Sequence, residues 1–415
     1  MKGWAYKKIN EIGKVQTGST PQTADKANYG DHIPFIKPGD FLKDGSLTYK
    51  NQGLSEQGLR NARLVERDSV LMVCIGATIG KVGFTEQEVV TNQQINTLTP
   101  LHGDSAKFIF YQMLTQDFQQ KVLSGAGQAT LPIINKKKWS NLSLHLPHPL
   151  EQKRIVAIVD NAFEGIDRAI ANTEKNLTNA RELFESYLNA IFTRKGDGWV
   201  EKKLSEIGGK VFTGPFGSLL HKSDYISNGI PIVNPANIED GEIIPNFNKT
   251  VSQDVIVRLK AYVLSENDIV IGRRGEIGRC AVVRKEQAGW LCGSGSFFIK
   301  TFENVDSVFL THLFRSAQYR NQLESLSAGA TMQNLSNQAL AGLLIAMPPL
   351  DEQNRITDKL DDLKAETQRL EAIYQQKLVS LNELKQAILQ KAFTGELTAD
   401  TANQTTKAAE EVIAA

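Results

Sequence analysis

The spacing of hydrophobic and polar residues marks two long segments of this chain as helical. Each segment begins at a proline, Pro149 or Pro349, and continues without another proline to Phe192 or Phe393. In the second segment, positions that alternate at spacings of three and four form a heptad seam. The seam comprises Leu360, Leu363, Thr367, Leu370, Tyr374, Lys377, Leu381, Leu384 and Ile388.

The first segment repeats this register 201 positions earlier with smaller residues. Its seam comprises Val159, Ala162, Ile166, Ala169, Thr173, Asn176, Ala180, Leu183 and Tyr187. A helix over the 44 residues from Pro149 to Phe192 would be roughly 65 Å long at ~1.5 Å per residue, and its apolar stripe needs a partner. We therefore predict an antiparallel coiled coil whose seam includes Val159, Ile166, Leu183, Leu360, Leu363, Leu370, Leu381 and Leu384.

An alternative interpretation is two ordinary amphipathic helices that each pack on one core. Globular helices average about 11–12 residues, so the length of these segments favours the coiled coil.

The segments that precede the two helices have a different pattern. They are rich in glycine, proline and short β-branched runs bounded by turn residues, such as Ser69–Val73 and Asp268–Ile271. This pattern predicts globular domains that are α/β (α+β) or mostly β.

The chain also repeats itself, which organises the whole architecture. Trp4 and the following Lys7–Gly13 recur as Trp199 and Lys202–Gly208. Further matches stay in order while the offset grows from 195 to 201, as loop insertions on a shared scaffold produce. They are Ile33-Pro34 with Ile230-Pro231, Ile79-Gly80 with Ile277-Gly278, Pro149-Leu150 with Pro349-Leu350, and Phe192-Thr193 with Phe393-Thr394.

We accordingly predict five segments. They are a first globular domain (1–148), a first spacer helix (149–195), a second globular domain (196–347), a second spacer helix (348–396) and a mobile C-terminal tail (397–415). If the helices pair antiparallel, the two domains lie at opposite ends and an approximate two-fold axis relates them.

Composition limits the class of protein. The 47 Lys and Arg residues balance 46 Asp and Glu, so the net charge of +1 does not by itself point to nucleic acid or membrane as a partner. Three cysteines without a C-x-x-C pair fit a reducing compartment. No signal peptide is apparent, and the longest apolar run, Ala339–Met347, is too short to cross a bilayer. We expect a soluble cytoplasmic protein.

The chain contains near matches to catalytic motifs, and each lacks a residue that the motif requires. Gly76–Val82 resembles a phosphate-binding loop but has one residue too few between its glycines and lacks the hydroxyl that binds magnesium. Asn234–Asn237 lacks the aromatic residue of an amino-methyltransferase motif, and the six histidines form no metal-binding spacing. We expect no catalytic site, no metal site and no cofactor in this chain.

Positive charge is concentrated locally. Residues 1–148 hold 17 basic and 12 acidic residues, and the second domain clusters Arg273, Arg274 and Arg279 among glycines. Glycine lets a backbone approach a ligand closely, and arginine suits bidentate contacts with guanine or phosphate. The equivalent turn of the first domain carries Lys81. The alternative is a solvated loop whose charges serve solubility.

An ordered set of motifs resembles the specificity (S) subunit of type I restriction-modification enzymes. The set comprises Gly18–Pro21, Tyr29–Asp31, Ile33–Pro38, Pro149–Ile155, Thr213–Ser218, Leu220–Tyr225, Gly229–Pro231, Pro349–Ile356 and Leu384–Leu397. The resemblance covers nearly all of the chain except its last 18 residues.

This resemblance implies that each globular domain is a target recognition domain for half of a split DNA sequence, with the helices as the spacer. The chain would bind double-stranded DNA and two modification (methyltransferase) subunits, which carry S-adenosylmethionine, and restriction subunits, which use ATP and Mg²⁺. The chain itself would catalyse nothing. We predict DNA contacts from Lys37, Lys81 and Gln93 in the first domain and from Arg273, Arg274 and Arg279 in the second.

Two alternatives remain open from the sequence. One is an S-like subunit of another restriction class, which serves a fused methyltransferase-nuclease. The other is a coiled-coil scaffold that binds only proteins.

Overall fold

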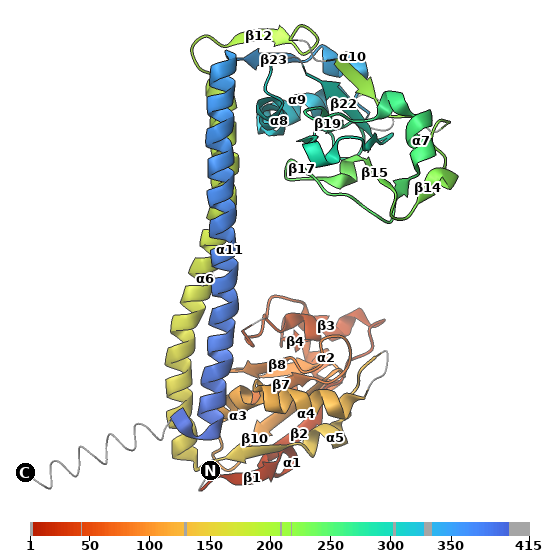
Figure 1. Cartoon of the computed structure of the whole chain (residues 1–415). Helices are drawn as coiled ribbons and strands as arrows, with labels where there is room; N and C mark the ends of the chain where they lie inside the picture. Colours follow the sequence, from red (N-terminus) through yellow and green to blue (C-terminus); the bar gives the residue numbers. More distant parts are fainter. Residues whose placement is uncertain are drawn as a thin grey trace, which may run out of the picture. The chain divides into compact units, whose positions relative to one another are not determined.

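The chain divides into two compact units, each built from one globular domain and parts of two long helices. The computed structural model describes residues 3–42, 44–127, 131–207, 210–216, 218–301, 304–327 and 334–397. The first unit is Met1–Thr173 with Gln376–Ala415, and the second is Glu174–Gln375. The helices are α6 (Pro149–Arg194) and α11 (Leu350–Thr394), drawn in yellow-green and blue in Figure 1. The predicted tail lies outside the described residues beyond Leu397.

The first domain is centred on a four-stranded antiparallel sheet in the order β2-β10-β7-β8. Strand β7 is buried along its whole length, and because successive side chains point to opposite faces, both faces of the sheet need cover. Val70 and Met72 pack with α3 and α4, whereas Leu71 and Val73 pack with residues of the small sheet β4-β9-β6. The result is a three-layered α/β domain (Figure 1).

The elements of this domain follow the chain in this order: β1 (Ala5–Lys8), α1 (Ile9–Ile12), β2 (Gly13–Thr17), β3 (Tyr29–Gly30), β4 (Phe35–Ile36), β5 (Gly53–Leu54), α2 (Glu56–Arg60), β6 (Leu64–Val65), β7 (Ser69–Val73), β8 (Val82–Thr85), β9 (Val89–Thr91), β10 (Ile95–Pro100), α3 (Ala106–Met113), α4 (Gln116–Ala126), α5 (Lys136–Ser140) and β11 (Ser143–Leu146). Strand β1 pairs with β11, and β4 runs parallel to β9.

The second domain repeats this architecture. Its central sheet has the order β13-β22-β19-β20, the counterpart of β2-β10-β7-β8. Ile269 and Ile271 pack with α8 and α9, whereas Val270 packs in the core on the other face. The strands β15 and β21 repeat the parallel pair of β4 and β9. The duplicated α/β domain that the sequence predicts is therefore confirmed.

The elements of the second domain are β12 (Val200–Lys203), β13 (Lys210–Thr213), β14 (Tyr225–Ile226), β15 (Ile230–Val233), β16 (Ile238–Glu239), β17 (Glu242–Ile243), β18 (Thr250–Val251), α7 (Gln253–Arg258), β19 (Ile269–Gly272), β20 (Cys280–Val282), β21 (Leu291–Cys292), β22 (Ser296–Lys300), α8 (Ser307–Arg315), α9 (Ala317–Ser327), α10 (Asn337–Ala341) and β23 (Leu344–Met347).

Within each unit the two long helices run in opposite directions. In the first unit, Lys385 of α11 lies over the ring of Phe163 and pairs with Asp167 of α6, while the end of α11 shares a core with the start of α6. In the second unit, Arg181 pairs with Glu371 at 3.1 Å, and the end of α6 shares a core with the start of α11. No helix among the described residues combines the length and apolar character needed to cross a bilayer.

The residues of the predicted seam differ in burial. Val159, Ile166 and Leu360 are buried, and Leu363, Leu370 and Leu381 are half-buried. The prediction is wrong for two residues at equivalent positions of the repeat: Leu183 is 50% exposed and Leu384 is 47% exposed.

The reason for this error is the difference between the helical and heptad periods. A straight helix has 3.6 residues per turn, so a strict 3.5-residue repeat drifts around it by about 20° per heptad. Near the end of α6 the buried residues are spaced by four, namely Phe184, Leu188 and Phe192, and they belong to the core of the second domain.

An aromatic cluster repeats where each helix ends. In the first unit the ring of Phe108 lies 5.9 Å from that of Trp4 and 5.0 Å from that of Phe393 at the end of α11. In the second unit Phe309 contacts Trp199 at 5.9 Å and Phe192, at the end of α6, at 5.5 Å. Each domain is thus packed against the start of its own helix and the end of the other repeat's helix.

Candidate nucleic-acid interface

In the first domain, three turns meet at the carboxyl ends of the parallel strands β4 and β9. The turn after β4 begins at Lys37, and the turn after β9 begins at Asn92, whose N–H donates to the carbonyl oxygen of Ile36 at 3.1 Å. The third turn follows β2, where the N–H of Ser19 donates to the carbonyl oxygen of Thr91 at 2.9 Å. We refer to the turns Gly18–Thr20, Lys37–Asp40 and Asn92–Gln94 as the first turn cluster.

Two of the three predicted DNA contacts of this domain belong to the first turn cluster. Lys37 is exposed, and its backbone N–H donates to Oδ2 of Asp40 at 2.7 Å, which fixes the turn. Gln93 is exposed and hydrogen-bonds the hydroxyl of Thr20. The structure therefore brings Lys37 and Gln93 to the same edge of the small sheet.

Lys81 lies elsewhere, at the end of the connection between β7 and β8. Its backbone N–H donates to the carbonyl oxygen of Thr78 at 3.2 Å, and the preceding Gly80 accepts a hydrogen bond from Gln119 of α4 at 2.9 Å. The side chain of Lys81 is exposed. No contact among the described residues joins it to Lys37 or Gln93, so its role as a DNA contact stays a separate prediction.

The second domain builds the same cluster with different side chains. Asn234 follows β15 as Lys37 follows β4, and its N–H donates to Oδ1 of Asn237 at 3.1 Å. Ser294 takes the position of Gln93, and Phe216 takes that of Thr20. We refer to Gly214–Phe216, Asn234–Asn237 and Gly293–Gly295 as the second turn cluster.

Arg273 adjoins the second turn cluster but is buried. Its backbone N–H donates to the carbonyl oxygen of Gly295 at 3.0 Å, and its guanidinium lies 5.6 Å from the ring of Phe216 and 5.1 Å from that of Phe297. Its Nε donates to Oδ1 of Asn334 at 3.1 Å, and the residue is only 6% exposed. Burial, followed by the charge of Arg274, lowers the pKa of Arg273.

Arg274 differs from Arg273 in its exposure. It is exposed, and its Nε lies 3.4 Å from Oδ1 of the same Asn334. Within the described part of the chain neither Arg273 nor Arg274 forms an ion pair with a carboxylate. Arg279, in contrast, pairs with Glu276, and its Nη1 donates to the carbonyl oxygen of Ile238 at 3.3 Å. Arg274 is therefore the most available of the three predicted arginines.

Sequence reasoning missed two residues of this region. Phe216 lies within the Thr213–Ser218 motif of the family resemblance but was not predicted as a DNA contact, and Asn334 was not singled out. Aligning the two copies residue by residue would have placed Phe216 opposite Thr20. Nothing local in the sequence marks Asn334 as the shared acceptor of two arginines.

The structure also explains why the phosphate-loop resemblance at Gly76–Val82 fails. A phosphate-binding loop joins a strand to a helix N-terminus, whereas this segment joins the antiparallel strands β7 and β8. Burial raises the pKa of Cys74 and of Cys280 to about 12, so neither thiol is a nucleophile at neutral pH. Among the residues that the structure describes, no cluster of His, Cys, Asp or Glu could hold a metal ion.

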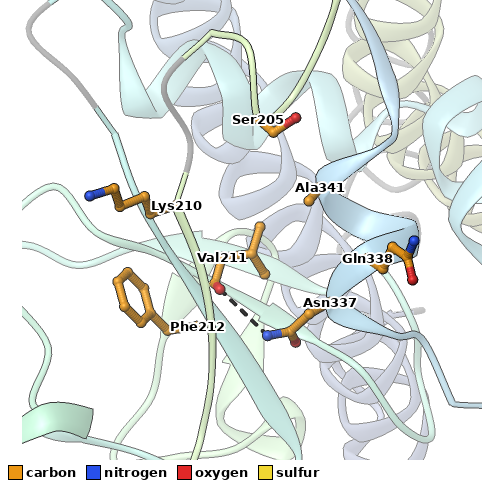
Figure 2. A pocket seen from close by; sticks show the side chains of 7 residues that line it. All are labelled: Ser205, Lys210, Val211, Phe212, Asn337, Gln338 and Ala341. Atoms are coloured by element: carbon orange, nitrogen blue, oxygen red, sulfur yellow. Dashed lines mark hydrogen bonds between the residues drawn. The ribbon is translucent and has the colours of Figure 1, made fainter.

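A hollow of about 570 Å³ lies between β13 and α10 of the second domain (Figure 2). Nδ2 of Asn337 donates to the carbonyl oxygen of Val211 at 3.5 Å across its floor, and Phe212 lines one side. Lys210 is the one charged residue among the described residues that line it. Among the described lining residues this lysine has no acidic partner, so they offer no acid–base pair.

Comparison with known proteins identifies the domain. The family model described as "Type I restriction modification DNA specificity domain" matches residues 1–179 and again residues 196–379. The chain belongs to this family. The resemblance to type I specificity subunits is thereby confirmed, and the two matched segments each contain one of the repeated domains.

Curated relatives and solved structures resemble this chain over most of its length. The specificity subunit of the type I restriction enzyme EcoBI from Escherichia coli is 21% identical over 95% of this chain and 86% of its own length. A chain from a structure of a type I R-M system superposes with a TM-score of 0.78 at 18% identity, over 95% of this chain and 99% of that chain. The HsdS subunit from Thermoanaerobacter tengcongensis superposes with a TM-score of 0.58 at 18% identity, over 95% and 97% of the two chains. The structures show a shared fold.

Proposed function

We propose that this chain is the DNA-recognition subunit of a type I restriction-modification complex and that each domain reads one half of a bipartite target. The observation that supports this most strongly is the repeated turn cluster, which exposes Lys37 and Gln93 in one domain and adjoins the exposed Arg274 in the other. Amide and guanidinium groups are the side chains that form bidentate contacts with adenine and guanine. A duplicated cluster on a duplicated domain fits two half-sites.

In this proposal the chain supplies recognition and its partners supply the chemistry. Two modification subunits, each with S-adenosylmethionine, methylate an adenine in the target, and restriction subunits use ATP and Mg²⁺ for translocation and cleavage. The chain holds no cofactor of its own and works in the cytoplasm, where these partners meet DNA. The continuous helices α6 and α11 connect the domains and define the length of unread DNA between the half-sites.

Long-read mapping of methylated adenines in cells that carry the complete system tests this proposal. We expect one bipartite sequence, with Gln93→Ala relaxing only the first half and Arg274→Ala only the second. The matched control is Lys202→Ala, which removes an exposed charge from β12 outside both turn clusters. A scaffold that binds only proteins would leave the methylated sequence unchanged in all three variants, and the proposal would then fail.

A further inference from the structure

We infer that Phe216 contacts the 5-methyl group of a thymine in the major groove of the second half-site, with Arg273 as the positioning residue that holds its ring. This inference rests on the proposed function and names one determinant of specificity within it.

Phe216 is an exposed aromatic residue on a constrained turn. Its side chain is 56% exposed although it is one of the larger apolar groups of the domain. The turn begins at Gly214, where a Cβ atom would overlap the carbonyl oxygen of Gly293, and continues through the buried Pro215. The backbone before Phe216 therefore has little freedom to fold the ring away from solvent.

Arg273 packs against the face of this ring. Its guanidinium lies over the rings of Phe216 and Phe297, at 5.6 Å and 5.1 Å from their centroids, and its Nε donates to Oδ1 of Asn334. A guanidinium over an aromatic face is attractive, and more so when it is shielded from water. At 6% exposure Arg273 is too buried to reach a base edge from this position, so we assign it to orienting Phe216.

The chemistry around the ring selects the type of contact. One face of Phe216 is occupied by Arg273, which disfavours insertion between two base pairs, because a wedge needs both faces free. Stacking on an unpaired base would tolerate any sequence and would not add specificity. Apolar contact with the thymine methyl is the major-groove interaction that a phenylalanine edge makes, and the adjacent exposed Arg274 supplies donors for a neighbouring base.

The first domain has no aromatic ring and arginine at the positions of Phe216 and Arg273, so the inference applies to the second half-site only. Thr20 occupies the position of Phe216, and its hydroxyl bonds Gln93. Cys74 occupies the position of Arg273, since the N–H of Cys74 donates to Gln94 as that of Arg273 donates to Gly295. The first turn cluster therefore presents polar groups where the second presents an aromatic ring.

The experiment uses the chain in complex with its methyltransferase subunits and duplexes that carry the mapped target. Each thymine of the second half-site is replaced in turn by deoxyuridine, which removes only the methyl group, and the Kd is measured by fluorescence anisotropy at one salt concentration. We expect one position at which the replacement weakens binding about fourfold, the value for one buried methyl-sized group. Thymine replacements in the first half-site serve as the DNA control.

The protein variants then locate the contact. Phe216→Ala should bind the thymine and deoxyuridine duplexes equally, Phe216→Leu should retain part of the difference, and Arg273→Gln should reduce it. Phe212→Ala is the matched control, because Phe212 is a partly exposed ring on the adjacent β13 that stacks on Phe298 instead. Its discrimination should equal that of the unmodified chain.

Several results would overturn the inference. These are a second half-site of only G·C pairs, no deoxyuridine effect at any position, or a uniform loss of affinity by Phe216→Ala on all duplexes. In each case the unmodified complex would still distinguish its target from scrambled DNA. If it cannot, the proposed function itself fails, and the two failures are thus separable.

Discussion

Oε1 of Gln353 accepts a hydrogen bond from the backbone N–H of Asp306 at 2.9 Å, which ties the start of α11 to the start of α8. Nε2 of the same side chain donates to the carbonyl oxygen of Pro348 at 2.9 Å. Gln152 repeats the first contact with Ser105 at 2.8 Å at the start of α6. Both glutamines are buried, so one residue per repeat joins a domain to the start of its helix by hydrogen bonds.

Gln353→Ala should therefore lower the free energy of unfolding of the second unit by about 2–4 kcal/mol, because it leaves the part-buried N–H of Asp306 and the buried carbonyl oxygen of Pro348 without partners. Urea unfolding measures the loss, and hydrogen exchange at the Asp306 amide should become faster. Gln338→Ala, an exposed glutamine on α10, is the control and should change stability by less than about 0.5 kcal/mol. Equal effects of the two variants would contradict a role of the Gln353 hydrogen bonds in joining α11 to the second domain.

Arg274→Ala should weaken binding of the methyltransferase complex to its target by about 1–3 kcal/mol and relax one base pair of the second half-site. The physical reason is that Arg274 is exposed beside the second turn cluster without a carboxylate partner among the described residues. Binding titrations on single-base variants of the target, repeated at several salt concentrations, measure both effects. A uniform loss across all sequences, with a shallower salt dependence, would instead make Arg274 a phosphate contact.

The pair of Asp361 and His312 predicts a stability change in acid. Oδ1 of Asp361 lies 3.3 Å from Nε2 of His312, and this hydrogen bond lowers the pKa of Asp361. A carboxyl whose pKa is lower in the folded than in the unfolded state stabilises the fold above its unfolded value, near 3.9, and loses that contribution as the pH falls through its folded value.

Asp361→Asn should therefore be less stable than the unmodified chain above the unfolded pKa of about 3.9, and the difference should shrink as the pH falls below that value through the lower folded pKa. Urea unfolding at a series of pH values measures it. In a His312→Gln background the same substitution should have little further effect, because the partner is already absent. A difference that persists unchanged into acid would show that Asp361 stabilises the unit in another way.

Changing the length of α6 and α11 tests whether the helices set the spacer. Insertion of four residues near the middle of both helices adds about 6 Å, close to two base pairs of B-form DNA. The mapped target should keep both half-sites while the unread spacer changes in length. An unchanged target would refute this role, and insertion of four residues into an exposed loop of one domain is the matched control for general disturbance.

The repeated residues show how far sequence reasoning reached. Collinear matches such as Trp4 with Trp199 and Phe192 with Phe393 predicted a duplicated domain, and the same residues form equivalent aromatic clusters in the two units. The heptad pattern predicted the buried Val159 but failed at Leu183, because the helical period is not that of the heptad. Periodicity predicts which residues form the apolar face of a helix. Only the packed structure shows how the buried face shifts around the helix along its length.

For the candidate interface, too, the sequence determined some features and the tertiary structure decided others. The sequence by itself determined that arginines and glycines cluster in the second domain, that the chain is built from two copies, and that its motifs are those of type I specificity subunits. Only the tertiary structure decided that Arg273 is buried between two rings while its neighbour Arg274 is exposed, and that Phe216 and Asn334 join them. The physical reason is that exposure and hydrogen-bond partners depend on strands and turns far apart in the chain, whereas residue type and spacing are local.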